Sequence, residues 1–264
     1  MDAVFDWRPS MENPTLDLIH VHASVRHYKP DPLPDAMIEA IVAAGQHAST
    51  SSNLQQYSVV AVTDAARREA LAHLCGDQKH ILEAPLFLAW CADLARLDGI
   101  CQSHGYTQVT SYVENLLVAA VDVGIAAQNA ALAAESLGLG ICYIGYIRNN
   151  PEEIIRLLEL PRLVFPITGM TVGWPSKPHH LRPRLPLQAV LHRERYTPID
   201  ESALCAYDRA MQATGIYRGR QVPVPGKSGE MEGYGWLEHS ARRVSLAERT
   251  GLRQALEKQG FGLN

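Results

Sequence analysis

The amino-acid sequence predicts an α+β protein in which strands and helices are mixed along one domain. The chain has 264 residues, 47% of them hydrophobic, which is enough for a large core. Its longest apolar region is 116–147, and a helix of roughly seven or eight turns is expected over about 110–137, closed by Gly138 and Gly140. This helix is too apolar to be a simple crossover between parallel strands, so we expect one α+β domain with extensions.

Three observations place the elements of the first half. Pro34 fits the first turn of a helix, Asp64 is a good N-cap, and the uninterrupted apolar run 86–91 is typical of a central strand. The expected elements are helices over 14–20 and 34–48, a strand over 58–62, a helix capped by Asp64 that runs to 74, and a strand over 86–91.

The second half contains one strong helix start and one segment without periodicity. Asn150 and Pro151 precede two glutamates, which combines a capping amide, a first-turn proline and acids at the positive end of the helix dipole. The segment 215–235 is rich in glycine and proline and is either a mobile loop over a site or a linker. The other expected elements are strands over 141–144, 164–172 and 189–191, a helix from Asp200 to 213, and an amphipathic helix over 237–259.

The composition argues against several classes of protein. The net charge is −4 and no lysine- or arginine-rich block occurs, so nucleic acid is not expected as a partner. The five cysteines show no CxxC spacing, which favours reduced thiols in the cytoplasm. The N-terminal residues lack the pattern of a signal peptide. Asp122 and Glu135 interrupt the longest apolar region, so we expect a helix buried on nearly all sides rather than a membrane span.

Two short runs place polar side chains at every second position. In an extended backbone His22, Ser24 and Arg26 share one face, and so do Arg182 and Arg184 around a proline. Guanidinium groups match the oxygens of a phosphate, so the two runs together predict a site for a doubly charged phosphate. Each run alone is more typical of a solvated loop.

Two polar loops are ambiguous when considered alone. The run from Ser49 to Gln56, with Thr50, Ser51 and Ser52, can hydrogen-bond a polar ring and a ribityl chain, but such residues also end helices routinely. The turn 76–80, which contains Gln78, is in isolation better explained as a connection between helices.

The usual nucleotide, metal and hydrolase motifs are absent from the sequence. Gly138 and Gly140 form a GxG without a third glycine, and they follow a helix and precede a strand, the reverse of a dinucleotide fingerprint. There is no GxxxxGK[ST], HExxH or GxSxG motif, and the histidines are scattered. We therefore expect neither a Rossmann site nor a metal site.

A set of weak motifs nevertheless occurs in one order over roughly residues 14–213. They are H-A-S-V-R-H-Y (22–28), S-S-N-L-Q (51–55), G-D-Q-K-H (76–80), A-Q-N-A (127–130), A-E-S-L-G-L-G (134–140), Y-I-G (143–145), R-N-N (148–150), G-W-P (173–175) and P-R-L-P (183–186). This order resembles the nitroreductase family, and within it the oxygen-insensitive NADPH nitroreductases and FMN reductases of the NfsA/Frp type.

The resemblance implies an intertwined homodimer with a central, mostly antiparallel sheet surrounded by helices and one FMN per subunit at the interface. It implies a partition into an FMN-binding domain (1–214), a mobile loop (215–236) and a C-terminal helix (237–264) packed on the main domain or the partner subunit. The hydride donor would be NADPH or NADH, and the acceptors small aromatic molecules, with no membrane partner.

The resemblance also implies roles for individual residues. The FMN ligands would be His22, Ser24, Arg26, Thr50, Ser51, Ser52, Gln78, Tyr143, Ile144, Gly145, Arg182 and Arg184. Thr50, Ser51 and Ser52, which belong to the run from Ser49 to Gln56 (the serine loop), would be supplied by the partner subunit. Arg218, together with Arg220, would contact the 2′-phosphate of NADPH. No side chain is expected to act as a general acid or base, because the flavin carries the chemistry.

The sequence departs from the family pattern at four places. Ala23 replaces an arginine, Arg182 replaces a lysine, Tyr146 replaces a second glycine, and the 215–235 loop carries extra glycine and proline. Nicotinamide preference and substrate range are therefore open.

The expected function is an FMN-dependent NAD(P)H oxidoreductase that reduces nitroaromatics, quinones or flavins by a ping-pong mechanism. Two alternatives remain at this point: a flavin reductase that supplies reduced FMN to a partner enzyme, and a flavin-binding protein with little turnover.

Overall fold

The computed structural model of the chain describes residues 13–224 and 229–264, and these divide into two compact units. The larger unit comprises Pro14–His179 and Arg249–Asn264, and the smaller one contains His180–Glu248. The functional partition expected from the sequence, into 1–214, 215–236 and 237–264, divides the chain differently and stays a prediction. Lys227, in the glycine-rich segment, lies outside the described residues.

A four-stranded antiparallel sheet forms the centre of the larger unit, in the order β1-β2-β4-β3. The strands are β1 (Tyr57–Val62), β2 (Leu86–Asp93), β3 (Gly140–Ile144) and β4 (Val164–Gly173). Strand β2, the predicted central strand, lies between β1 and β4 and is buried along its whole length. The predicted antiparallel α+β architecture is confirmed.

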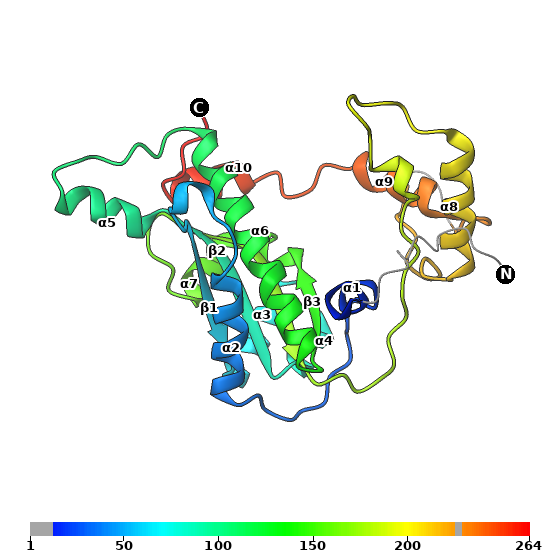
Figure 1. Cartoon of the computed structure of the whole chain (residues 1–264), viewed down its shortest axis with the longest axis horizontal. Coiled ribbons are helices and arrows are strands. Elements are labelled where there is room, and N and C mark those ends of the chain that lie inside the picture. Colours follow the sequence, from blue (N-terminus) through cyan, green and yellow to red (C-terminus); the bar gives the residue numbers. More distant parts are fainter. Residues whose placement is uncertain (1–12, 225–228) are drawn as a thin grey trace. The chain divides into compact units, whose positions relative to one another are not determined.

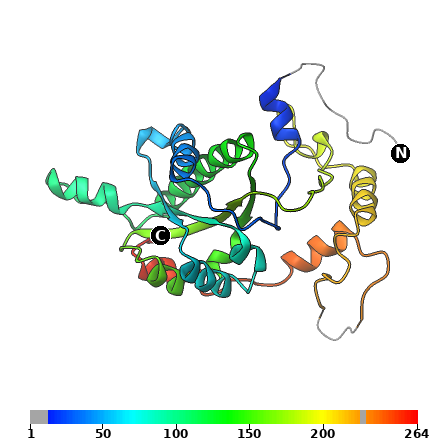
Figure 2. The same ribbon diagram turned by 90° about the horizontal axis from the view of Figure 1, so that it is seen from below.

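Helices cover both faces of this sheet, as Figures 1 and 2 show. Helices α2 (Asp35–Gln46) and α6 (Val113–Ser136) lie on one face, and α3 (Ala65–Leu74), α4 (Lys79–Glu83) and α7 (Pro151–Leu157) on the other. Because strand side chains alternate between faces, Leu88 and Trp90 of β2 pack in the first core, and Phe87 and Ala89 in the second. Helix α10 (Leu252–Lys258) packs in a third core with Phe165.

Helix α6 buries one side and exposes the other, so the expectation of burial on nearly all sides is wrong for the single chain. Val113, Leu117, Val121 and Ile125 follow one another at four-residue spacing and are 41–56% exposed. By length and composition alone α6 could span a membrane. In this unit, however, it packs on α2 and the sheet and carries the buried Asp122 in its middle.

Two further expectations about secondary structure are wrong, and one helix was not expected. Residues 237–259 form two helices, α9 (Trp236–Val244) and α10, rather than one. The segment 189–191 is not a strand, since a 3-10 turn, η3 (Leu187–Ala189), occupies this region and Val190 is exposed. Helix α5 (Ala95–Ser103) was not expected, and Figure 1 shows it extending away from the sheet of its own unit.

The predicted helix starts differ in how they are capped. Asp64 accepts a hydrogen bond from the backbone N–H of Arg67 at 2.8 Å, and Asp200 accepts one from Ser202 at 3.0 Å, so both caps are confirmed. Asn150 does not cap its helix with its side chain, because its Nδ2 donates to the carbonyl of Leu74 at 2.7 Å.

The smaller unit contains α8 (Glu201–Ala213) and α9, which pack on each other. The rings of Tyr207 and Trp236 meet edge to face with centroids 5.2 Å apart. Asp208 Oδ1 accepts the N–H of Leu237 at 2.7 Å, which satisfies an otherwise unpaired donor at the start of α9.

Candidate functional site

The segment His22–Arg26 lies extended against β3, as the alternating pattern predicts. It follows α1 (Pro14–His20), and the N–H of Val25 donates to the carbonyl of Ile141 at 2.8 Å. Ala23 and Val25 are buried, whereas Ser24 and Arg26 are exposed and His22 is half-buried. The three polar side chains therefore share the outward face.

Gly140 makes this close approach possible. A Cβ at this position would lie 2.6 Å from Val25 Cβ and 2.9 Å from Val25 Cγ1, well inside ordinary contact distance. The second glycine of the GxG motif therefore serves packing. Gly138, the first, ends α6 with a φ of +79°, which suits glycine.

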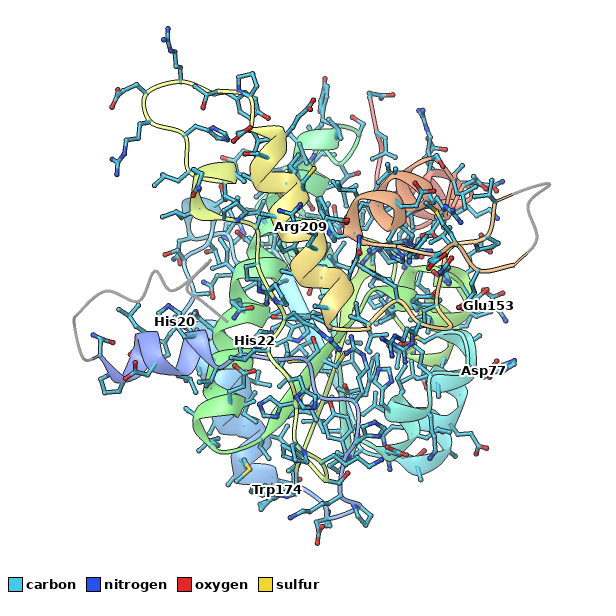
Figure 3. All side chains as sticks on the ribbon, turned by 90° about the vertical axis from the view of Figure 1, so that its right-hand side faces the viewer. His20, His22, Asp77, Glu153, Trp174 and Arg209 are labelled. Atoms are coloured by element: carbon cyan, nitrogen blue, oxygen red, sulfur yellow. The ribbon has the colours of Figure 1, made fainter. Side chains whose placement is uncertain are left out.

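A carboxylate of α6 orients His22. His22 Nδ1 lies 2.6 Å from Glu135 Oε1, so the ring nitrogen donates to the carboxylate and Nε2 is left for another partner. Figure 3 shows His22 beside this helix, two residues beyond His20 at the end of α1. The second oxygen of Glu135 is buried and has no hydrogen-bond partner in the described part of the chain.

Arg26 acts electrostatically on the turn that carries Gln78. The pKa of His80 is lowered to about 4, mainly by burial and then by the charge of Arg26, while Glu83 opposes the shift. His80 is 8% exposed, and its Nε2 has no hydrogen-bond partner among the residues that the structure describes. Glu83 forms an ion pair with Lys79 at 2.9 Å, and this hydrogen bond is the main cause of its lowered pKa. Burial and the charge of Arg26 together keep His80 neutral.

Ser24 lies beside the thiol of Cys142 on β3. Burial raises the pKa of Cys142, while the charge of Arg26 and a hydrogen bond with Ser24 act in the opposite direction. The pKa is raised on balance, so Cys142 is a protonated core residue rather than a nucleophile.

The turn 76–80 is tight and shaped by left-handed residues. Gly76 and Asp77 have φ values of +80° and +54°, and Gln78 Nε2 donates to the carbonyl of Cys75 at 2.8 Å. Figure 3 shows Asp77 at the outer edge of this turn. The ring of Tyr146 covers Gly76, since a Cβ there would meet its Cδ1 at 3.0 Å. Tyr146 therefore narrows the space next to Gln78.

The residues 143–145 lie at the end of β3. Tyr143 is partly buried, and its hydroxyl donates to Gln128 at 3.4 Å. Ile144 is buried in the core beneath the sheet, so only its backbone can face a ligand. Gly145 has open space around it, with Arg148 Nη2 the nearest atom to a Cβ at 3.6 Å.

The serine loop lies far from His22 within one chain. The backbone N–H of Ser51 donates to Asp122 on α6, whereas His22 binds Glu135 of the same helix. Asp122 and Glu135 are 13 positions apart on α6, and a helix rises ~1.5 Å per residue, so the two anchors are separated by roughly 20 Å. Thr50, Ser51 and Ser52 thus do not join His22, Ser24 and Arg26 in one subunit.

The smaller unit gathers three of its arginines around one pocket. The pocket has a volume of about 580 Å³. Its lining includes Arg182, Arg218 and Arg220, with Thr214 and Gly215 at the end of α8. Arg184 lies instead near Tyr207, whose pKa burial raises and this arginine lowers. The predicted phosphate site of Arg26, Arg182 and Arg184 (the phosphate clamp) combines residues of both units and stays a prediction.

The described part of the glycine-rich segment is anchored by aromatic residues. Tyr234 hydroxyl accepts the N–H of Val222 at 3.0 Å and lies 3.1 Å from His239 Nδ1. The ring of Tyr217 stacks on His239 with centroids 4.4 Å apart, and Arg242 lies 5.0 Å from the centroid of the Tyr234 ring. Arg218 and Arg220 therefore follow Tyr217 on a segment with fixed attachment points.

Three groups next to these residues were not recognised from the sequence: Asp122, Glu135 and His80. The signal in the sequence for the two acids was their position inside an apolar helix, where a carboxylate needs a hydrogen-bonding partner. Within 13–224 and 229–264, no cluster of three or more His, Cys, Asp or Glu could hold a metal ion.

Comparisons with known proteins agree with this arrangement. Residues 19–174 match the nitroreductase family, and residues 182–264 match the C-terminal domain of the nitroreductase family. The chain is 40% identical over 249 residues to an oxygen-insensitive NADPH nitroreductase of Salmonella typhimurium, covering 94% of this chain and 98% of that protein. It is 39% identical over 244 residues to an FMN reductase [NAD(P)H] of Bacillus subtilis, covering 91% and 94%.

A solved structure has the same fold. NfrA2 of B. megaterium superposes with a TM-score of 0.88 at 36% identity, and the match covers 96% of this chain and 100% of that one. With both parts of the chain matched by the family and the antiparallel sheet in common, the chain belongs to the nitroreductase family.

Proposed function

We propose that this protein is an FMN-dependent NAD(P)H oxidoreductase that reduces small aromatic acceptors such as nitroaromatics, quinones or flavins by a ping-pong mechanism. The observation that carries the proposal is the outward row of His22, Ser24 and Arg26 at β3, in a chain of this family. Relatives named NADPH nitroreductase and FMN reductase support the same assignment.

The residues present fit a flavin mononucleotide. His22 presents a free ring nitrogen because Glu135 holds the other, and Arg26 adds a guanidinium suited to a phosphate or a ring oxygen. Gly145 leaves room for a flat ring to approach the end of β3. When bound, FMN supplies hydride acceptance and donation. The chain holds it, orients it and surrounds it with positive charge.

The site is proposed to be completed by a second copy of the chain. The roughly 20 Å between the anchors of the serine loop and of His22 supports a site in which these two segments come from different subunits. The exposed apolar row of α6, from Val113 to Ile125, supports a dimer, since such patches commonly mark protein interfaces.

Arg218 and Arg220 are proposed to bind NADPH. Together with Arg182 they line a single pocket, and a concentration of guanidinium groups favours a phosphate monoester such as the 2′-phosphate. The five cysteines are unpaired, which supports a cytoplasmic location.

The proposal is tested by FMN binding to the apoprotein and two variants. Arg26→Ala should raise the Kd for FMN at least tenfold, since a hydrogen bond to a charged group contributes about 1.5–3 kcal/mol. Arg67→Ala is the control, because the guanidinium of this exposed residue of α3 pairs with the exposed Glu159 at 3.3 Å and its backbone contact remains in the variant. Equal FMN affinity of both variants, or no FMN binding by the wild type, would contradict the proposal.

A further inference from the structure

A buried carboxylate holds the serine loop at both of its ends. Asp122 of α6 is 1% exposed. Its Oδ1 accepts the backbone N–H of Ser51 at 3.0 Å, and its Oδ2 accepts the backbone N–H of Gln56 at 3.2 Å. Burying a carboxylate is costly unless it is hydrogen-bonded, so these two bonds account for its presence in the core.

Between these two attachment points the backbone is strained. Ser52, Asn53 and Gln55 have φ values of +48°, +56° and +53°, in the left-handed region that residues with a side chain adopt only rarely. Such backbone persists only where surrounding contacts impose it, and it concentrates at ligand sites. The two bonds to Asp122 bracket all three strained residues.

This arrangement orients the loop toward the surface of α6. With the N–H groups of Ser51 and Gln56 turned toward the core, the side chains of Ser51 and Ser52 are exposed. Val121 and Ile125, which flank Asp122 on the helix, belong to the exposed apolar row. The loop is therefore presented beside the face that is proposed to meet the second subunit.

We propose that Asp122 is a positioning residue that holds the serine loop in its flavin-binding shape, so that Asp122 of each subunit controls the flavin affinity of its partner. The inference rests on the proposed function and adds a residue that touches no flavin. A purely structural role would instead lower stability and leave FMN affinity unchanged.

The first test compares FMN Kd values of three variants. Asp122→Asn keeps the volume but turns one acceptor into a donor facing a backbone N–H, so the Kd should rise about 10–100-fold. Asp64→Asn makes the same change at an exposed cap that also accepts a backbone N–H, and should leave the Kd unchanged. Leu256→Ala, in the third core, should lower Tm without changing the Kd.

Two further readouts separate positioning from simple damage. At saturating FMN, the rate of reduction per bound flavin should be that of the wild type, because Asp122 contacts no reacting atom. Gln55→Gly should restore part of the affinity of Asp122→Asn, since glycine adopts the left-handed backbone without strain. If Asp122→Asn alone fails to fold, the FMN Kd is measured on the double variant Asp122→Asn with Gln55→Gly and compared with that of Gln55→Gly alone.

Mixed dimers test the action across subunits. A dimer of one Asp122→Asn chain and one Arg26→Ala chain has both defects in one site and none in the other. It should therefore recover one FMN of wild-type affinity per dimer. If Asp122 acts within its own subunit, each site carries one defect and none recovers.

The outcomes distinguish this inference from the function on which it rests. A wild-type Kd for Asp122→Asn, or a mixed dimer without a recovered site, overturns the role of Asp122 alone. Absence of FMN binding by the wild-type protein overturns the proposed function as well.

Discussion

Gly140→Ala should separate flavin binding from the rest of the fold. The added methyl group would lie 2.6 Å from Val25 Cβ and 2.9 Å from Val25 Cγ1, whereas carbon atoms pack at about 3.5–4.0 Å. The Val25 Cβ is fixed to the backbone, so relief requires the segment His22–Arg26 to move by about 1 Å. Overpacking of this kind costs ~1–3 kcal/mol, a fall in Tm of roughly 2–12 °C.

The effect on FMN should be larger than the effect on stability implies. Displacing the segment weakens at least one hydrogen bond to a charged group, so the Kd for FMN should rise about 10–100-fold. The assay is quenching of flavin fluorescence on titration of the apoprotein, with Tm measured in parallel. Gly99→Ala, in α5, has no atom within 4 Å of the new Cβ and should stabilise the helix slightly.

A rescue experiment completes this test. Val25→Ala removes the Cγ atoms and should return part of the lost affinity in the Gly140→Ala background. An unchanged Kd for Gly140→Ala with a normal Tm would refute the reasoning that Gly140 sets the position of His22, Ser24 and Arg26.

Three other changes test separate parts of the account. Arg218→Ala should lower kcat/KM for NADPH roughly tenfold to hundredfold, while kcat/KM for NADH and the FMN content stay unchanged. Equal losses of kcat/KM with both nucleotides would exclude a contact with the 2′-phosphate. Leu117→Asp should sediment as a monomer and bind FMN weakly, because it places a charge in the exposed apolar row of α6. Val244→Asp, at another exposed residue, should remain a dimer that binds FMN. A Leu117→Asp monomer that retains FMN would contradict the shared site. The pKa of His80 is lowered from 6.5 to about 4 in the folded chain, so only the unfolded chain takes up this proton as the pH drops below 6.5. The free energy of unfolding should therefore decrease by up to about 3 kcal/mol between pH 6.5 and pH 4. In urea titrations His80→Gln should show a smaller decrease, and a decrease identical to that of the wild type would exclude His80 as the cause.

Local patterns were sufficient where local contacts decide the structure. The alternation of Ala23 and Val25 with polar neighbours correctly predicted an extended segment with His22, Ser24 and Arg26 on one face. Asp64 likewise predicted the start of α3, because an N-cap bonds within its own first turn.

Contacts distant in sequence were not predictable in this way. The strained serine loop depends on Asp122, which follows Ser51 by 71 residues, and no turn residue signals the left-handed φ of Gln55. The interruption between α9 and α10 has the same origin, because the two helices pack in different units and Arg249 between them has a φ of +53°. The triplet 189–191 is apolar but lies at the surface, and none of the strands in the described residues pairs with it.

The residues of the phosphate clamp illustrate a third limit. Similar arginine runs predicted that Arg26, Arg182 and Arg184 act together, yet periodicity says nothing about how two units of one chain, or two chains, combine. Their joint action stays a prediction that the Kd for FMN of single and double variants can test.

The most direct test of the central claim is an anaerobic titration of the purified, FMN-reconstituted protein with NADPH, followed by absorption spectroscopy. We expect one FMN per chain, loss of the visible flavin absorption with one equivalent of NADPH, and its return when a quinone or nitroaromatic is added. A protein that binds no flavin, retains only FAD, or keeps its flavin absorption in the presence of both NADPH and NADH would contradict it.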